Sequence, residues 1–87
     1  MYVLILEGAL AADELTRLER LYPTRWQVDS YTWLLKSNQT TRQISEATFP
    51  RTPEGVASKR HVVFGIAAWW GYHDRAMWEW LDLNSTA

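Results

Sequence analysis

The stretch RWQVDSYTWLLKS, residues 25–37, decides the fold because it reads as two short strands joined by a tight turn. Residues 25–28 alternate between polar and apolar side chains, which is typical of a half-buried strand. Asp29 and Ser30 are turn formers, and residues 31–37 are again rich in β-branched and aromatic side chains. We therefore predict a β-hairpin in the middle of the chain.

A helix is predicted on each side of this hairpin. Upstream, AADELTRLERLYP (residues 11–23) places apolar residues three and four apart and ends in a proline, the pattern of an amphipathic helix with a defined end. Downstream, NQTTRQISEATFP (residues 38–50) carries Thr40 followed by Gln43, which fits a capping box at a helix N-terminus. The hairpin therefore connects two helices.

The two most apolar segments lie outside these helices, and we expect both to form buried strands at the centre of the sheet. They are YVLILE, residues 2–7, and RHVVFGIA, residues 60–67. The loop over residues 51–59 precedes the second of them. A third, short helix is predicted over residues 74–81, with Asp74 as its N-cap.

This order of elements predicts an α+β protein with the ferredoxin-like βαββαβ arrangement, a four-stranded antiparallel sheet in the order 4-1-3-2 and a short C-terminal helix. We expect a single domain over residues 1–82 and a frayed tail over residues 83–87. The first two helices cover one face of the sheet. The other face is also apolar, so it needs cover from the third helix and from a second subunit. The residues predicted to be mostly buried are Leu4, Leu6, Leu15, Leu18, Trp33, Leu35, Ile44, Val63 and Trp78.

Composition excludes several classes of site. The chain has 87 residues, a formal net charge of −1 and no cysteine, which leaves neither a disulfide nor a thiolate metal site. His61 and His73 are far apart in sequence, so a histidine-based zinc motif is absent. The longest apolar run, MYVLIL, is too short for a membrane span or a signal peptide, and we expect a cytoplasmic protein without membrane contact. The net charge argues against a whole-surface nucleic-acid binder but leaves room for a local basic patch.

The densest basic grouping is the candidate nucleic-acid-binding edge, since basic side chains of this kind contact phosphates. Glu46 and Glu54 are interleaved with it, so four cations less two carboxylates leave a local charge of about +2. The two histidines are candidate general bases. His61 lies within a predicted strand and is expected to be a hydrogen-bonded edge or surface histidine, and nothing in the sequence pairs His73 with a nucleophile. The basic grouping consists of Arg42, Arg51, Lys59 and Arg60.

Four of the six tryptophans lie within AAWWGYHDRAMWEWL, residues 67–81. Met77, Trp78 and Leu81 recur at helical spacing and are expected to face inward. At least one of the remaining tryptophans of this stretch is then partly exposed, beside more acidic than basic side chains. That setting suits a protein interface better than base stacking. The predicted partner interface consists of Trp69, Trp70 and Trp80.

Several strings resemble small proteins of the CRISPR-associated protein 2-like or SinR-like family. VDSYTWLLKSNQTTRQI, residues 28–44, is similar to the family's middle strand and the capped helix that follows it. HVVFGI, followed by an aromatic turn and MWEWL, resembles the last core strand and the closing segment, and YVLILEG resembles the first strand. The likeness covers roughly residues 2 to 81. The residues that carry the middle match are Thr32, Trp33, Leu34, Leu35, Lys36, Thr40, Gln43 and Ile44.

The resemblance implies a homodimer of ferredoxin-like subunits. In some members an aspartate at the end of the first strand lies near the two-fold axis and holds a divalent metal for phosphodiester hydrolysis, while in others the dimer is a DNA-binding platform. Here Glu7 stands at that position, so Glu7 is the candidate metal ligand and catalytic residue, with Mg²⁺ or Mn²⁺ as the cofactor. Glutamate is one methylene longer than aspartate, and an octahedral ion is exacting about ligand placement.

We therefore expect a non-catalytic homodimeric interaction module that acts through protein contacts and, as a further option, nucleic-acid contacts. The first alternative is a divalent-metal-dependent endonuclease that uses paired Glu7 carboxylates at the dimer axis. The second alternative is a toxin–antitoxin or phage-borne regulator that binds another protein.

Overall fold

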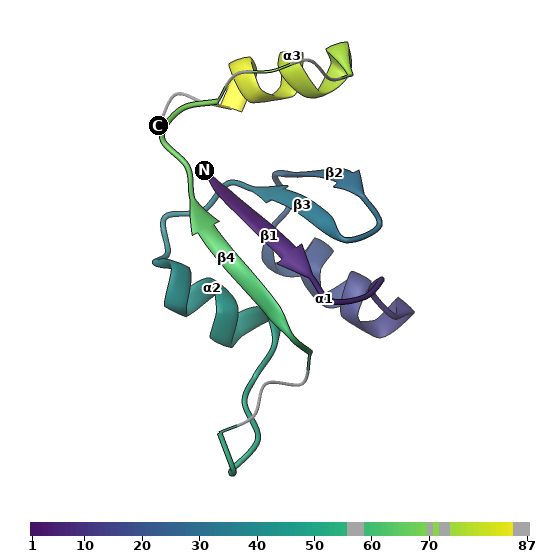
Figure 1. Cartoon of the computed structure of the whole chain (residues 1–87), viewed down its shortest axis with the longest axis vertical. Coiled ribbons are helices and arrows are strands. Elements are labelled where there is room, and N and C mark those ends of the chain that lie inside the picture. Colours follow the sequence, from purple (N-terminus) through teal and green to yellow (C-terminus); the bar gives the residue numbers. More distant parts are fainter. Residues whose placement is uncertain (56–58, 70, 72–73, 85–87) are drawn as a thin grey trace.

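The computed structural model describes residues 1–55, 59–69, 71 and 74–84 of the chain. It is an α+β structure with a four-stranded antiparallel sheet and three helices (Figure 1). Its elements follow one another as β1 (Tyr2–Leu6), α1 (Ala12–Leu21), β2 (Arg25–Asp29), β3 (Thr32–Leu35), α2 (Thr41–Thr48), β4 (His61–Gly65) and α3 (Arg75–Asn84). Among the described residues, no helix has both the length and the apolar character that a bilayer crossing requires.

The strands lie in the order β2-β3-β1-β4, which confirms the predicted order 4-1-3-2. β1 is central, as expected, because it pairs with β3 on one side and with β4 on the other. The expectation that the apolar segment 60–67 is also central is wrong, since β4 is an edge strand. Its apolar residues are therefore not explained by burial between two neighbouring strands.

Local hydrogen bonds position the predicted turn and helix starts. The Asp29 carboxylate accepts from the Tyr31 backbone N–H at 2.8 Å, which stabilises the hairpin turn. The Thr40 hydroxyl accepts from the Gln43 N–H at 3.2 Å, and the Gln43 side chain accepts from the Thr40 N–H at 2.9 Å. This confirms the capping box of α2. Asp74 caps α3 through the Ala76 N–H at 2.7 Å.

The third helix is longer than predicted. It continues through Leu83 and Asn84, which were expected in the frayed tail. The Asn84 side-chain amide donates to the Trp80 carbonyl oxygen at 2.8 Å, which satisfies one of the last carbonyls of the helix. Residues 85–87 lie outside the described residues.

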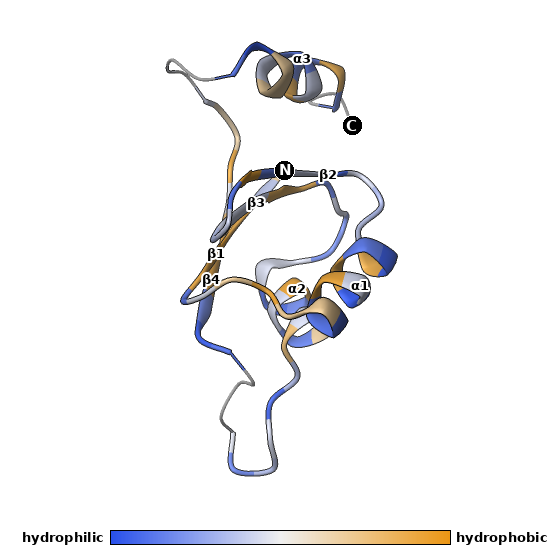
Figure 2. Ribbon diagram, turned by 90° about the vertical axis from the view of Figure 1, so that its right-hand side faces the viewer, coloured by the Kyte–Doolittle hydropathy of each residue, from blue (hydrophilic) through white to orange (hydrophobic). Residues whose placement is uncertain are grey.

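The main core lies between the sheet and the pair α1 and α2 (Figure 2). Six of the predicted core residues are buried in it, whereas Leu15 and Val63 are only half-buried at its margin. Two buried residues were not predicted, Tyr22 and Phe49. Burial raises the pKa of the Tyr22 hydroxyl, while a hydrogen bond with Thr48 opposes that shift. The buried residues of this core are Leu4, Leu6, Leu18, Tyr22, Trp33, Leu35, Ile44 and Phe49.

A second core lies on the opposite face, where β2 and β3 separate α3 from the other two helices (Figure 2). Leu34 of β3 is buried there against Met77 and Leu81. The prediction that Trp78 is mostly buried is wrong, because it is half-buried at the margin of this core. Trp80, a predicted interface residue, is half-buried, and its ring lies 6.4 Å from that of Trp26, centroid to centroid.

Candidate interaction surface

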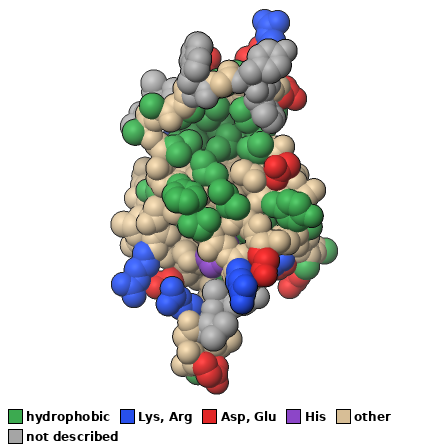
Figure 3. Space-filling model, in the orientation of Figure 1, with side chains coloured by type: hydrophobic (Ala, Val, Ile, Leu, Met, Phe, Trp, Pro, Cys, Tyr) green, Lys and Arg blue, Asp and Glu red, His purple; other side chains and the backbone are tan. Residues whose placement is uncertain are grey.

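The third helix covers only part of its face of the sheet. Val3 pairs with Phe64 and Ile5 pairs with Val62 across β1 and β4, so these four side chains share the face on which α3 packs. Beyond the reach of α3, Ile5 is 39% exposed, Val62 42% and Phe64 52%. We name these three residues the open face. Figure 3 shows apolar side chains gathered over β1 and β4 in the middle of the view.

An apolar cavity of about 370 Å³ adjoins the open face. It lies between α3 and the sheet, and Val3, which pairs with Phe64 of the open face, is one of its lining residues. Leu34, Trp69 and Leu81 also line it. The predicted interface residue Trp69 is thus half-buried beside the open face, whereas Trp70 lies outside the described residues. The apolar surface therefore runs from the edge of the sheet to α3.

Sequence reasoning predicted that this face of the sheet needs a second subunit, but it named tryptophans as the interface residues and not the three residues of the open face. The signal that identifies them is the alternation of side chains between the two sides of β4. Val62 and Phe64 are two apart in HVVFG, so they share one side of a strand, and Val63 lies on the other. A strand that is apolar on both sides needs cover on both, and α3 is too short to provide it along the whole sheet.

Most of the predicted nucleic-acid-binding cations are held by carboxylates. Three of the four form ion pairs, and the side chain of Lys59 is also largely covered. Arg51, which follows α2, is exposed. Below the apolar surface, basic and acidic side chains are mixed (Figure 3). Arg42 and Arg60 stay largely exposed in these ion pairs, so the contact of this grouping with phosphates stays a prediction. The ion pairs join Arg42 to Glu46 at 2.9 Å, Lys59 to Glu14 at 3.1 Å and Arg60 to Glu7 at 3.9 Å.

Glu7 follows β1 and is exposed, with Arg60 as its ion-pair partner. Its backbone N–H donates to the Arg60 carbonyl oxygen at 3.0 Å, which fixes the position of this residue at the end of the strand. Among the described residues, no cluster of three or more histidine, aspartate or glutamate side chains could hold a metal ion. The role of Glu7 as a metal ligand stays a prediction.

His61 has a partner that the sequence did not reveal. Its Nε2 lies 2.6 Å from the Ser45 hydroxyl and its Nδ1 lies 2.6 Å from the Lys59 carbonyl oxygen. A carbonyl only accepts, so Nδ1 donates, and in the neutral ring Nε2 accepts from Ser45. His61 is thus a histidine of the edge strand with both ring nitrogens hydrogen-bonded, as the sequence indicated. His73 lies outside the described residues.

The Ser45–His61 pair has the polarity of a nucleophile and its base. Ser45, however, lies in the middle of α2, and the Phe49 ring packs 4.6 Å from the His61 ring, centroid to centroid. We interpret the pair as a structural hydrogen bond that holds α2 against β4; we call it the His61–Ser45 tie. The two residues are 16 positions apart on different elements, which explains why no local pattern revealed them.

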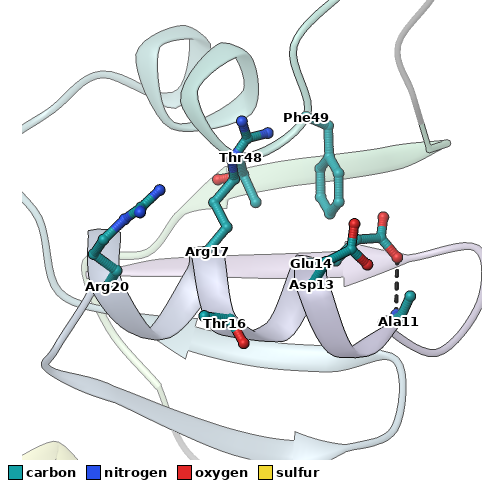
Figure 4. Close-up of a pocket in the computed structure, with 8 residues that line it drawn as sticks. All are labelled: Ala11, Asp13, Glu14, Thr16, Arg17, Arg20, Thr48 and Phe49. Atoms are coloured by element: carbon teal, nitrogen blue, oxygen red, sulfur yellow. Dashed lines mark hydrogen bonds between the residues drawn. The ribbon is translucent and has the colours of Figure 1, made fainter.

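A hollow of about 810 Å³ lies along α1, with Thr48 and Phe49 at the end of α2 on its far side (Figure 4). Arg17 extends from α1 toward Thr48. Glu14 also lines the hollow, but its carboxylate accepts from the Ala11 N–H at 2.9 Å and pairs with Lys59. The Glu14 carboxylate therefore serves helix capping and the attachment of the segment before β4.

The open face and the cavity beside it are thus the surface that the fold leaves without an internal role. Comparisons of the chain with protein-family models, with curated proteins and with solved structures find no match.

Proposed function

We propose that this protein is a non-catalytic, ferredoxin-like interaction module that forms a homodimer through the β1–β4 side of its sheet. The observation that carries the proposal is the open face, where Ile5, Val62 and Phe64 stand in water beside an apolar cavity. Contiguous apolar surface of this kind marks a contact site in soluble proteins.

The energetics favour association. Each square ångström of apolar surface removed from water contributes about 25 cal/mol. A standard interface buries about 800 Å² on each partner, which is a modest part of the 6032 Å² that this chain exposes. Closed two-fold pairing is the commonest arrangement of small oligomers, and the resemblance to the CRISPR-associated protein 2-like family implies a two-fold dimer as well.

The charges favour a protein partner over a nucleic acid. The open face carries no charged residue, and three of the four candidate cations are already paired with carboxylates. Nucleic-acid binding draws on unpaired positive charge, whereas the centre of a protein interface is depleted in charge.

Light scattering at micromolar concentration tests this proposal. We expect a mass of about twice the 10.2 kDa of one chain. Val62→Lys places a charge on the open face and is expected to give a single-chain mass. Leu21→Lys is the matched control, because Leu21 at the end of α1 is 39% exposed and lies away from the open face.

The control variant is expected to keep the mass of the unaltered protein. A single-chain mass for the unaltered protein across the concentration range would overturn the proposal. Equal masses for the two lysine variants would show that the open face is not the contact.

A further inference from the structure

The two edges of the sheet are built differently. The edge strand β2 carries Arg25 and Asp29 and has an irregular register between Gln27 and Asp29. Charges and bulges of this kind protect an edge from pairing with another chain. β4 has none of these features, since its sequence HVVFG contains no acidic residue, lysine, arginine or proline, and its register with β1 is unbroken.

The backbone of β4 presents a regular row of groups along its free edge. The Glu7 N–H donates to the Arg60 carbonyl oxygen, and the Ile66 N–H donates to the Met1 carbonyl oxygen. Together with the pairing of β1 and β4, these bonds identify which residues of β4 form hydrogen bonds with β1. In an antiparallel pair, alternate residues bond to the neighbouring strand. Residues 60, 62, 64 and 66 therefore bond toward β1. The residues that direct N–H and C=O groups outward are His61, Val63 and Gly65.

We propose that this edge pairs with β4 of a second copy, antiparallel about a two-fold axis at Val63, to form one continuous eight-stranded sheet. Val63 then pairs with its own counterpart and His61 with Gly65 of the other copy, and each of these pairs exchanges two backbone hydrogen bonds. The same register places Val62 opposite Phe64 on the face that α3 leaves open. The proposal rests on the homodimer proposed above and specifies how its two copies meet.

The side chains fit a second copy. In each sheet, Phe64 lies beside Val3 and Val62 lies beside Ile5. The two-fold pairing joins these into apolar rows that cross the interface, and aromatic and β-branched neighbours of this kind stabilise a sheet. Val62 and Phe64 are exposed partly because an edge strand has a neighbour on one side only. The second copy supplies the missing neighbour.

The charges fit as well. No cross-strand pair in this register brings two like charges together, since Arg60 falls opposite Ile66 of the other copy. α2, which packs against β4, runs antiparallel to its counterpart across the same axis. Its exposed Arg42 and Glu46 are four residues apart, so the antiparallel arrangement brings Arg42 of one copy toward Glu46 of the other. Pairing of α2 with its counterpart also adds area that a five-residue strand alone does not supply.

Cysteine cross-linking tests the register, because the chain contains no native cysteine. Val62→Cys and Phe64→Cys are prepared as separate proteins, checked for native circular dichroism, mixed and oxidised. In the proposed register, these two positions are opposite each other in a non-hydrogen-bonded pair, about 4.5 Å apart between Cα atoms, which is within disulfide range. In either variant alone, the two cysteines lie about 7–8 Å apart on the diagonal, beyond that range.

We expect the mixture to give a dimer cross-linked between position 62 of one copy and position 64 of the other, identified by peptide mass spectrometry, and each single variant to give at least ten-fold less. A dimer by light scattering that shows no enrichment of the mixed cross-link would overturn the edge pairing and leave the proposed homodimer intact. A protein that stays a single chain in light scattering would overturn both. Strong cross-linking of Val62→Cys with itself would indicate that the sheets pack face to face instead.

Discussion

Trp33 combines a buried aromatic ring with a buried polar group that lacks a partner among the described residues. It is buried in the main core, yet its indole N–H has no hydrogen-bond partner among the described residues. An unpaired buried donor costs free energy because it has lost its hydrogen bonds to water. The indole is nevertheless retained, since a large aromatic ring buries more apolar surface than any smaller side chain.

Two substitutions separate these effects. We expect Trp33→Ala to lower the free energy of unfolding by about 3–5 kcal/mol, because it leaves a large cavity. We expect Trp33→Phe to cost only about 1–2 kcal/mol, since it keeps an aromatic ring and removes the unpaired donor. Urea denaturation measures both values. Equal costs for the two variants would show that the indole N–H makes a stabilising bond.

Residues such as Leu4, Leu18 and Ile44 could be predicted as core because their periodicity is local. Tyr22 continues the spacing of Leu15 and Leu18 although it stands at the C-cap of α1, whereas Phe49, at the C-cap of α2, could not be predicted in this way. Each precedes a proline, which disfavours helical backbone at the residue before it. Both adopt nearly the same non-helical backbone conformation, with φ of −129° and −131°, and both side chains are buried in the core.

At the scale of elements, the sequence predicted the identity of every described helix and strand and the strand order, but it also suggested that β4 is central, which that order excludes. Apolar content suggested a central strand, whereas the position in the sheet depends on how the chain crosses between strands. The same segment is therefore an edge strand, and two of its apolar residues, Val62 and Phe64, are exposed. The His61–Ser45 tie and the ion pairs of the basic residues could not be predicted either, because they depend on packing between distant elements.

The attachment of α3 depends on a few residues, and two leucines on this helix test it. Leu81 is buried against Leu34, whereas Leu83, two positions later, is 79% exposed. We expect Leu81→Ala to cost about 2–5 kcal/mol in urea denaturation because it removes a packed side chain. Leu83→Ala, which has the same effect on helix propensity, is expected to stay within about 0.5 kcal/mol of the unaltered protein. Similar costs at both positions would contradict the packing of α3 on the sheet.

At the scale of the whole molecule, the two faces of the sheet are covered unequally. α1 and α2 close one face with a core of eight buried residues, while α3 covers only part of the other and leaves Ile5, Val62 and Phe64 exposed. A chain of this length buries a modest fraction of its surface and is marginally stable unless it associates. The open face and the unprotected edge of β4 lie together on the uncovered side, so association and stability are expected to be linked.

This linkage predicts a melting temperature that depends on protein concentration. If folding and dimerisation are coupled, each ten-fold rise in concentration stabilises the dimer by about 1.4 kcal/mol. For a dimer of this total size, that corresponds to a rise in the melting temperature of about 3–6 °C. Val62→Lys is expected to abolish the dependence and Leu21→Lys to preserve it, as followed by circular dichroism over a hundred-fold concentration range. A melting temperature that is independent of concentration in the unaltered protein would show that the monomer is stable with its open face in water.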